Sequence, residues 1–262
     1  MKKILQKSIF GPSILIGFLV LSGCVSGGGK PTIDVVETKP NAERAMLHTR
    51  LAREYMEKEQ YAIAKQELEK ALRLDSSHSD SNYVMGLLQL QLKNSNDAEY
   101  YFERAVKSNP DNASAAHDFG MFLCQTGKER KSIEYFELAA VNPLFKRAEL
   151  SYMRAGECLS RIDDPKAELF LKKALEFNPR LKPALYQLAN LKNASGQNLS
   201  ARAYIERYLA ITKPQPDALL LAYEIESKLR AFDVAEKYRK KILESFPGSN
   251  AARRLRENKS GL

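Results

Sequence analysis

The sequence predicts an all-α fold in which six helix–turn–helix units follow one another along residues 42–249. Three observations predict it: two columns of residues that recur at a nearly constant interval, and prolines that close several of the intervals. The first column holds small side chains, at Ala64, Ala98, Ser132, Ala167, Ala201 and Ala235, with successive spacings of 34, 34, 35, 34 and 34. The second column has the same spacings and contains Ala71, Ala105, Ala139, Ala174, Tyr208 and Ile242. The prolines are Pro110, Pro179 and Pro247.

This interval is the length of a tetratricopeptide repeat, which is a pair of helices joined by a turn. We place the units at about 45–78, 79–112, 113–148, 149–181, 182–215 and 216–249. One pair alone cannot bury its apolar face, so the six pairs are expected to stack into a right-handed superhelical solenoid. The first helices of the pairs should line its concave face.

The columns have a packing role. Small residues in the first helices, at Ala52, Gly86, Gly120, Gly156 and Ala189, lie opposite the small column of the second helices. Two helix backbones approach closely where both carry small side chains. The prolines end second helices because Pro cannot donate a hydrogen bond to the preceding turn and restricts the residue before it. Unit 6 matches the columns least well, which suits a terminal capping position.

The N-terminal segment 1–23 differs sharply from the rest of the chain. Lys2, Lys3 and Lys7 precede an uncharged, mostly apolar stretch from Ser8 to Gly23. A membrane-spanning helix needs about 20 predominantly apolar residues, and this stretch is shorter and ends at small residues. The segment 1–23 is therefore predicted to be a signal peptide that is removed.

The stretch ends at Leu21-Ser22-Gly23-Cys24, which resembles the bacterial lipoprotein box. The resemblance implies that Cys24 receives diacylglycerol and becomes the new N-terminus. Such lipoproteins are held at the inner membrane by an Asp directly after the modified Cys, and Val25-Ser26 lacks this Asp. The resemblance therefore implies a lipid anchor on the periplasmic face of the outer membrane. The alternative for Cys24 is an ordinary small residue at a cleavage site. Residues 24–41, with three consecutive glycines and two prolines, are expected to be a flexible tether.

The chain has 41 basic and 32 acidic residues, a net charge of +9. Removal of the segment 1–23 takes away three lysines and no acid, so the net charge becomes +6. Much of this excess lies in residues 250–262, which we expect to be a basic C-terminal tail. For an exported protein this charge favours an anionic envelope surface or an acidic protein patch over nucleic acid. The alternative is a merely solvated surface.

The phase of the columns predicts which side chains face the concave groove. They are Met46, Thr49, Arg53 and Met56 in unit 1, Tyr83, Leu87 and Leu90 in unit 2, and His117 and Met121 in unit 3. In unit 4 the same phase points to Glu157, Ser160 and Arg161. Flexible Met side chains suit an adaptable peptide site, and an apolar partner segment is expected across units 1 to 3. The alternative is a phase error of one residue, which would place these side chains in the core.

Cys124 and Cys158 are separated by one repeat interval and occupy nearly equivalent positions in neighbouring units. In an oxidising periplasm they could form a disulfide; the alternative is two buried thiols. No Cys and His residues have the spacing of a metal site, and the chain has no phosphate-binding glycine loop or nucleophile motif. The carboxylates of Asp163 and Asp164 precede Pro165 and are typical of a turn and a helix start. We expect no catalytic residue, no cofactor, no metal and no small-molecule substrate.

The combination of the Leu21–Cys24 box, a short tether, six tetratricopeptide repeats and little else resembles the type IV pilus biogenesis/stability lipoproteins, the PilF/PilW family. The resemblance also includes local stretches, namely Ala45–Ala71, Asn109–Gly127 and the two cysteines Cys124 and Cys158. The resemblance implies a pilotin, an outer-membrane lipoprotein that binds the secretin subunit of the type IV pilus machine and supports its localisation and multimerisation. No catalytic residue is carried over. The alternative is an adaptor for another envelope machine, such as outer-membrane protein insertion or peptidoglycan enzymes.

Overall fold

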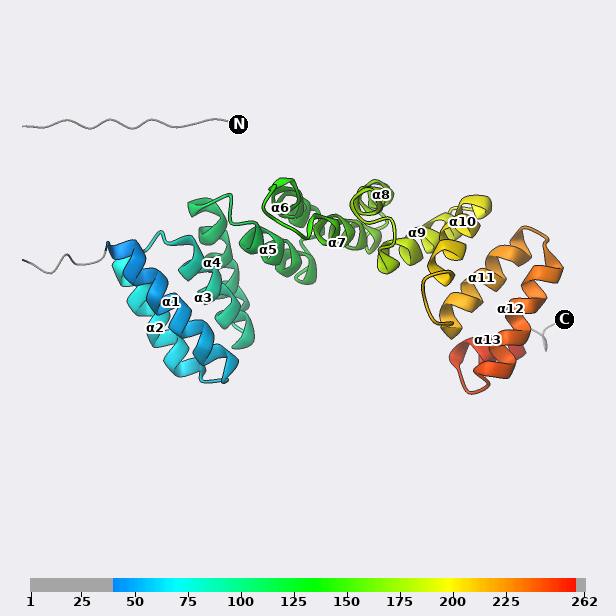
Figure 1. Cartoon of the computed structure of the whole chain (residues 1–262), viewed down its shortest axis with the longest axis horizontal. Helices are drawn as coiled ribbons and strands as arrows, with labels where there is room; N and C mark the ends of the chain where they lie inside the picture. The colour runs from blue at the N-terminus through cyan, green and yellow to red at the C-terminus, as the bar shows by residue number, and fades with distance from the viewer. Residues whose placement is uncertain (1–39, 258–262) are drawn as a thin grey trace, which may run out of the picture. The chain divides into compact units, whose positions relative to one another are not determined.

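The computed structural model describes residues 40–257, and this part of the chain contains helices and no strands. The predicted fold class is confirmed: helix pairs follow one another as a solenoid of tetratricopeptide repeats (Figure 1). The predicted signal peptide, Cys24 and the predicted tether up to residue 39 lie outside the described residues, as do residues 258–262. None of the helices between residues 40 and 257 is long and apolar enough to cross a membrane.

Odd-numbered helices up to α11 are the first helices of their pairs, and the even-numbered helices are the second. The helices are α1 (Asn41–Glu57), α2 (Tyr61–Leu74), α3 (Ser79–Gln91), α4 (Ser95–Ser108), α5 (Ala113–Gln125), α6 (Glu129–Val141), α7 (Ala148–Ser160), α8 (Ala167–Phe177), α9 (Lys182–Ala194), α10 (Asn198–Leu209), α11 (Pro216–Lys228), α12 (Phe232–Ser245) and α13 (Asn250–Glu257). Each pair packs internally and against the next pair along the chain. The buried core therefore continues from unit to unit and has no single centre.

Close helix–helix contact within a pair depends on the glycine column. A Cβ atom added to Gly86 or to Gly120 would lie 2.9 Å from the Cδ1 atom of Phe102 or Phe136, respectively. Both rings are fully buried. At Gly156 the added atom would lie 2.6 Å from Cγ of Leu171. A core at native packing density cannot absorb such an atom without displacing its neighbours, so these positions require glycine.

The turn between the two helices of each unit repeats one backbone conformation. Positive φ angles, between 51° and 78°, occur at Glu59, Lys93, Gly127, Asp163, Gly196 and Arg230, one in each unit. A left-handed residue is a common way to end a helix, because it lets the chain reverse while the last carbonyl groups stay hydrogen-bonded. Only two of the six positions hold glycine. The other four accept the strain of a side chain at positive φ.

The predicted basic tail over residues 250–262 is wrong for the part up to residue 257. Asn250–Glu257 forms helix α13, and Ala251, Ala252 and Leu255 are buried against α11 and α12. Ser249 starts the helix, since its hydroxyl accepts a hydrogen bond from the backbone N–H of Ala252 at 3.1 Å. The arginines of this segment lie on the outer face of the helix. The charge of these arginines suggested a solvated end of the chain. The opposite, apolar face of α13 instead covers the apolar surface of α11 and α12.

The positive φ of Gly127 leads to a stability prediction. The variant Gly127→Ala is expected to lower the free energy of unfolding by about 1–2 kcal/mol, because alanine is strained at positive φ. Nothing lies within 4 Å of the added Cβ, so the decrease in the free energy of unfolding is due to backbone strain and not to a steric clash. Gly248→Ala is the matched control: its surroundings are equally open and its φ is not positive. It should change stability by less than about 0.5 kcal/mol. Urea unfolding followed by circular dichroism measures both, and equal stabilities of the two variants would contradict the prediction.

Candidate functional site

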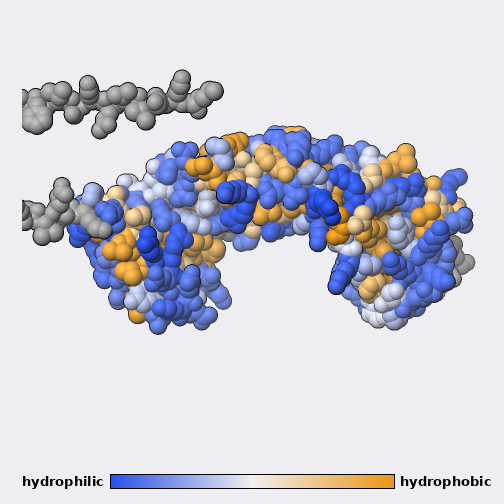
Figure 2. All heavy atoms as spheres, in the orientation of Figure 1, coloured by the Kyte–Doolittle hydropathy of each residue, from blue (hydrophilic) through white to orange (hydrophobic). Residues whose placement is uncertain are grey.

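An apolar hollow lies among the first helices of units 2, 3 and 4. It encloses about 370 Å³. Its lining residues are Leu87 and Leu90 of α3, Phe102 of α4, His117, Asp118, Met121, Phe122 and Gln125 of α5, Arg147 just before α7, and Leu150, Met153 and Arg154 of α7. Apolar side chains also reach the surface elsewhere, and Figure 2 shows them in separate patches between hydrophilic side chains.

Four of the predicted groove residues come together in this hollow: Leu87, Leu90, His117 and Met121. The unit 1 residues Met46, Arg53 and Met56 do not line it, although Met46 is exposed. The sequence analysis expects an apolar partner segment across units 1 to 3, whereas this hollow lies across units 2 to 4. Two side chains explain why unit 1 is left out.

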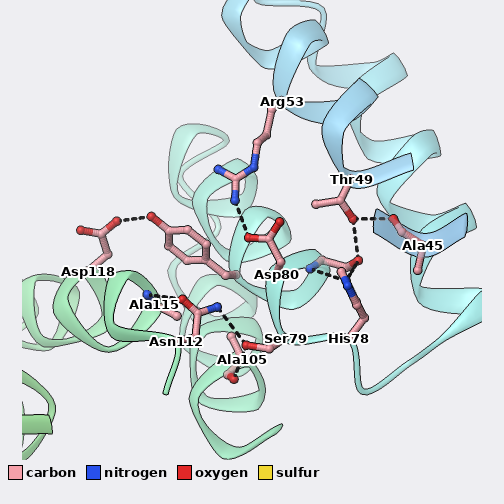
Figure 3. A network of polar contacts seen from close by, with 12 residues as sticks. Ala45, Thr49, Arg53, His78, Ser79, Asp80, Ala105, Asn112, Ala115 and Asp118 are labelled. Carbon is pink, nitrogen blue, oxygen red and sulfur yellow. Dashed lines mark hydrogen bonds and ion pairs between the residues drawn. The ribbon is translucent and has the colours of Figure 1, made fainter. Parts of the chain in front are cut away.

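Thr49 belongs to the core, contrary to its predicted groove position. It is fully buried, its hydroxyl donates a hydrogen bond to the carbonyl of Ala45 at 2.8 Å, and its oxygen lies 2.6 Å from the hydroxyl oxygen of Ser81 (Figure 3). Ser81 is on α3, so the contact joins the first helices of units 1 and 2. A short polar side chain at this crossing is covered by the neighbouring helix.

Tyr83 is also largely closed off. Its side chain is only 9% exposed, and its hydroxyl donates a hydrogen bond of 2.6 Å to a carboxylate oxygen of Asp118 (Figure 3). Burial and the neighbouring Asp118 raise the pKa of Tyr83, so the phenol stays protonated and remains a donor. The Arg53 guanidinium lies 5.5 Å from the ring centroid and is paired with Asp80. These contacts join α1 to α3 and α3 to α5 and keep the Tyr83 ring covered.

His117 forms part of the wall. It is buried, its Nδ1 lies 2.7 Å from the hydroxyl of Ser151 on α7, and its ring packs against those of Phe136 and Phe145. Burial lowers the pKa of His117, nearby Arg147 and Arg154 lower it further, and Asp118 opposes them. The imidazole is therefore neutral at pH 7 and joins α5 to α7.

The contribution of unit 4 was missed by the sequence interpretation. The predicted Glu157, Ser160 and Arg161 do not line the hollow, whereas Leu150, Met153 and Arg154 do. A signal was available, because Met153 lies three residues before Gly156, as His117 lies three residues before Gly120. The sequence interpretation named only residues after Gly156 in unit 4, whereas the hollow is lined by residues that precede it.

Cys124 and Cys158 are joined by a disulfide, with their Cα atoms 5.9 Å apart. Both lie in the last turn of their helices, α5 and α7, which form two walls of the hollow. Closing a loop of this length in the unfolded chain contributes about 4 kcal/mol in the loop-entropy model. The bond therefore holds the two walls at a fixed separation.

The hollow offers contact surface and a few charges. Between residues 40 and 257 no three His, Cys, Asp or Glu residues lie together as a metal site would require. The titratable residues that line the hollow are His117, Asp118, Arg147 and Arg154. A neutral histidine in the wall, one carboxylate bonded to a tyrosine and two arginines at the rim suit recognition of a segment of chain.

Comparison with known proteins agrees with the repeat assignment. The tetratricopeptide repeat family model matches residues 47–78 and 79–112. The chain is homologous to the type IV pilus assembly protein PilF of Pseudomonas aeruginosa, with 21% identity over 87% of this chain and 90% of that protein. The crystal structure of PilW, described as a widely conserved type IV pilus biogenesis factor, covers 80% of this chain and 97% of its own, with 28% identity and a TM-score of 0.62. The structure of Pseudomonas aeruginosa PilF covers 84% of this chain and 100% of its own, at 19% identity and a TM-score of 0.66.

The environment of His117 generates a prediction about pH. Its pKa in the folded protein is below the ordinary value of 6.5, so the unfolded chain binds more protons at this residue. The stabilising contribution is complete above pH 6.5 and is lost as the pH falls below it. The free energy of unfolding should therefore fall between pH 7 and pH 5, and His117→Gln should reduce this slope. Urea unfolding at both pH values measures the slope, and an NMR titration gives the pKa directly. A value above 6.5 for His117 would contradict the assignment.

Proposed function

We propose that this homologue of PilF is an outer-membrane lipoprotein that acts as a pilotin. It binds the secretin subunit of the type IV pilus machine and promotes the localisation of that subunit to the outer membrane and its multimerisation. One observation carries the proposal: a chain that aligns with PilF over nearly the whole length of both proteins presents an apolar hollow on its first helices. Pilus biogenesis and twitching motility would depend on this binding.

The physical basis is the masking of an apolar segment. Leu87, Leu90 and Met121 offer apolar surface to an incoming helix or extended segment. Removal of apolar surface from water contributes about 25 cal/mol for each Å², of which part is offset by the ordering of both partners. The disulfide between α5 and α7 reduces that ordering cost, because the walls are already positioned before binding.

The proposed lipid anchor determines the membrane to which the protein is localised. Cys24 lies outside the described residues, and its support is the lipoprotein box together with the uncharged stretch before it. Several acyl chains on one residue exceed the two signals needed for stable anchoring. In the sequence, the expected tether leads directly into α1, which begins at Asn41. In this proposal the protein performs no chemistry: it binds a partner and carries it to a membrane.

Binding is tested by a change in the hollow. Leu87→Glu places a charge on the apolar surface and should abolish co-purification of the secretin subunit, with a consequent loss of secretin multimers and twitching motility. Leu199→Glu is the matched control, because Leu199 is 71% exposed on α10 and lies away from the hollow. Circular dichroism of both variants should match that of the wild type. Normal secretin multimers with altered porin levels or cell shape in a deletion strain would instead favour the adaptor function.

The anchor is tested by two substitutions at the N-terminus. Cys24→Ala removes the acceptor of the lipid and should release the protein from the outer membrane, leaving secretin multimers misplaced. Val25→Asp keeps the acceptor and introduces an aspartate directly after it, so this variant should fractionate with the inner membrane. Density-gradient separation of membranes followed by immunoblotting measures both. Retention of Cys24→Ala in the outer membrane would show that another element holds the protein there.

A further inference from the structure

We infer that the segment bound in the hollow carries a carboxylate next to its apolar side chains, and that Arg147 and Arg154 recognise this carboxylate. The inference rests on the proposed function, since it concerns the same hollow and names the chemistry of its occupant. It also gives the occupant a direction: its apolar side chains lie over units 2 and 3, and its acidic group lies toward unit 4.

The lining is divided into an apolar part and a cationic part. Leu87, Leu90 and Met121 come from α3 and α5, whereas both arginines come from α7 and the residue before it. Leu150 lies between the two arginines in sequence and continues the apolar surface up to them. A segment that covers the apolar part would therefore bring its next turn against the two guanidinium groups.

Arg147 contacts an aromatic ring and has no acidic partner. Its guanidinium carbon lies 5.4 Å from the ring centroid of Phe145, within the range of a cation–π contact. Among the described residues no ion pair joins it to a carboxylate. An arginine that contacts a ring at the rim of an apolar hollow presents a planar array of donors to a ligand.

Arg154 retains donor capacity as well. It bonds a carboxylate oxygen of Glu157 through Nη1 alone, at 2.7 Å, and its side chain is 41% exposed. The Nε and Nη2 groups take part in no hydrogen bond within the described residues. A bound carboxylate could therefore accept bonds from Arg154 without displacing Glu157. Charge-assisted bonds of this kind are shorter and stronger than neutral ones.

The other titratable residues of the lining do not compensate the arginines. Asp118 is the only carboxylate that lines the hollow, and it already accepts the hydroxyl of Tyr83 on the unit 2 side. His117 is neutral and bonded to Ser151. Glu157 does not line the hollow but pairs with Arg154. The positive charge that has no ion-pair partner is therefore that of Arg147, located toward unit 4. A wholly apolar occupant would leave that charge partly desolvated without a partner, which is unfavourable.

The test uses the full mature chain and the purified secretin subunit of the same organism. Replacement of both arginines in Arg147→Gln/Arg154→Gln should weaken binding of the intact subunit at least tenfold, while Arg180→Gln, an exposed arginine outside the hollow, should leave it unchanged. Short overlapping synthetic peptides that tile the periplasmic part of the secretin then locate the segment by fluorescence anisotropy. The binding peptide should contain a carboxylate within one helical turn of its apolar residues.

A double-mutant cycle ties the carboxylate to the arginines. Changing the peptide carboxylate to an amide should weaken binding to the wild-type chain about tenfold, and should have little further effect on the double arginine variant. Equal binding of the intact subunit to the wild type and to the double variant would overturn the inference and leave the proposed function standing. Failure of the intact subunit to bind at all would overturn the proposed function and the inference with it. Thermal unfolding midpoints within a few degrees of wild type would exclude misfolding of the variants as the cause.

Discussion

The structure depends on the close approach of the two helices in each unit. At Gly86, Gly120 and Gly156 a single additional carbon atom would overlap the aromatic or leucine side chain of the partner helix. Because the paired helices are so close, the large side chains Phe102, Phe136 and Leu171 are enclosed completely within or between units. One pair still leaves an apolar face uncovered, so each pair needs a neighbour. The stacking of the units and the closing helix α13 follow from this requirement.

The same requirement places the first helices side by side and creates the hollow. What decides its extent is a set of polar contacts between neighbouring first helices. The contact of Thr49 with Ser81 and the bond of Tyr83 to Asp118 close the surface near unit 1. The disulfide of Cys124 and Cys158 and the contact of His117 with Ser151 join α5 to α7. The hollow remains open only between these closures, where Leu87, Leu90, Met121 and Leu150 reach its surface.

In the proposed function the hollow and the lipid anchor have separate roles. In the proposed function the repeats hold a partner segment, and the acylated Cys24 determines where the complex goes. A preorganised surface suits this role, since a carrier must bind its cargo without spending much of the interaction free energy on ordering itself. The pair of arginines beside an apolar surface would add selectivity, because a neutral apolar segment would leave the charge of Arg147 without a partner.

The sequence alone determined the fold class, the number of units and the positions of the close helix contacts, because these follow from a strict interval and from residue size. Of the residues that it predicts for a partner groove, Leu87, Leu90, His117 and Met121 line the hollow. It did not determine that Thr49 and Tyr83 are closed off, since their hydrogen-bond partners Ser81 and Asp118 belong to the next unit and meet them only when the units stack. The position of Arg147 and Arg154 beside the hollow and the helical nature of Asn250–Glu257 were likewise decided by tertiary packing. The sequence does not show whether a charged side chain faces solvent or the rim of a hollow, because its surroundings are determined by the packing of the neighbouring unit.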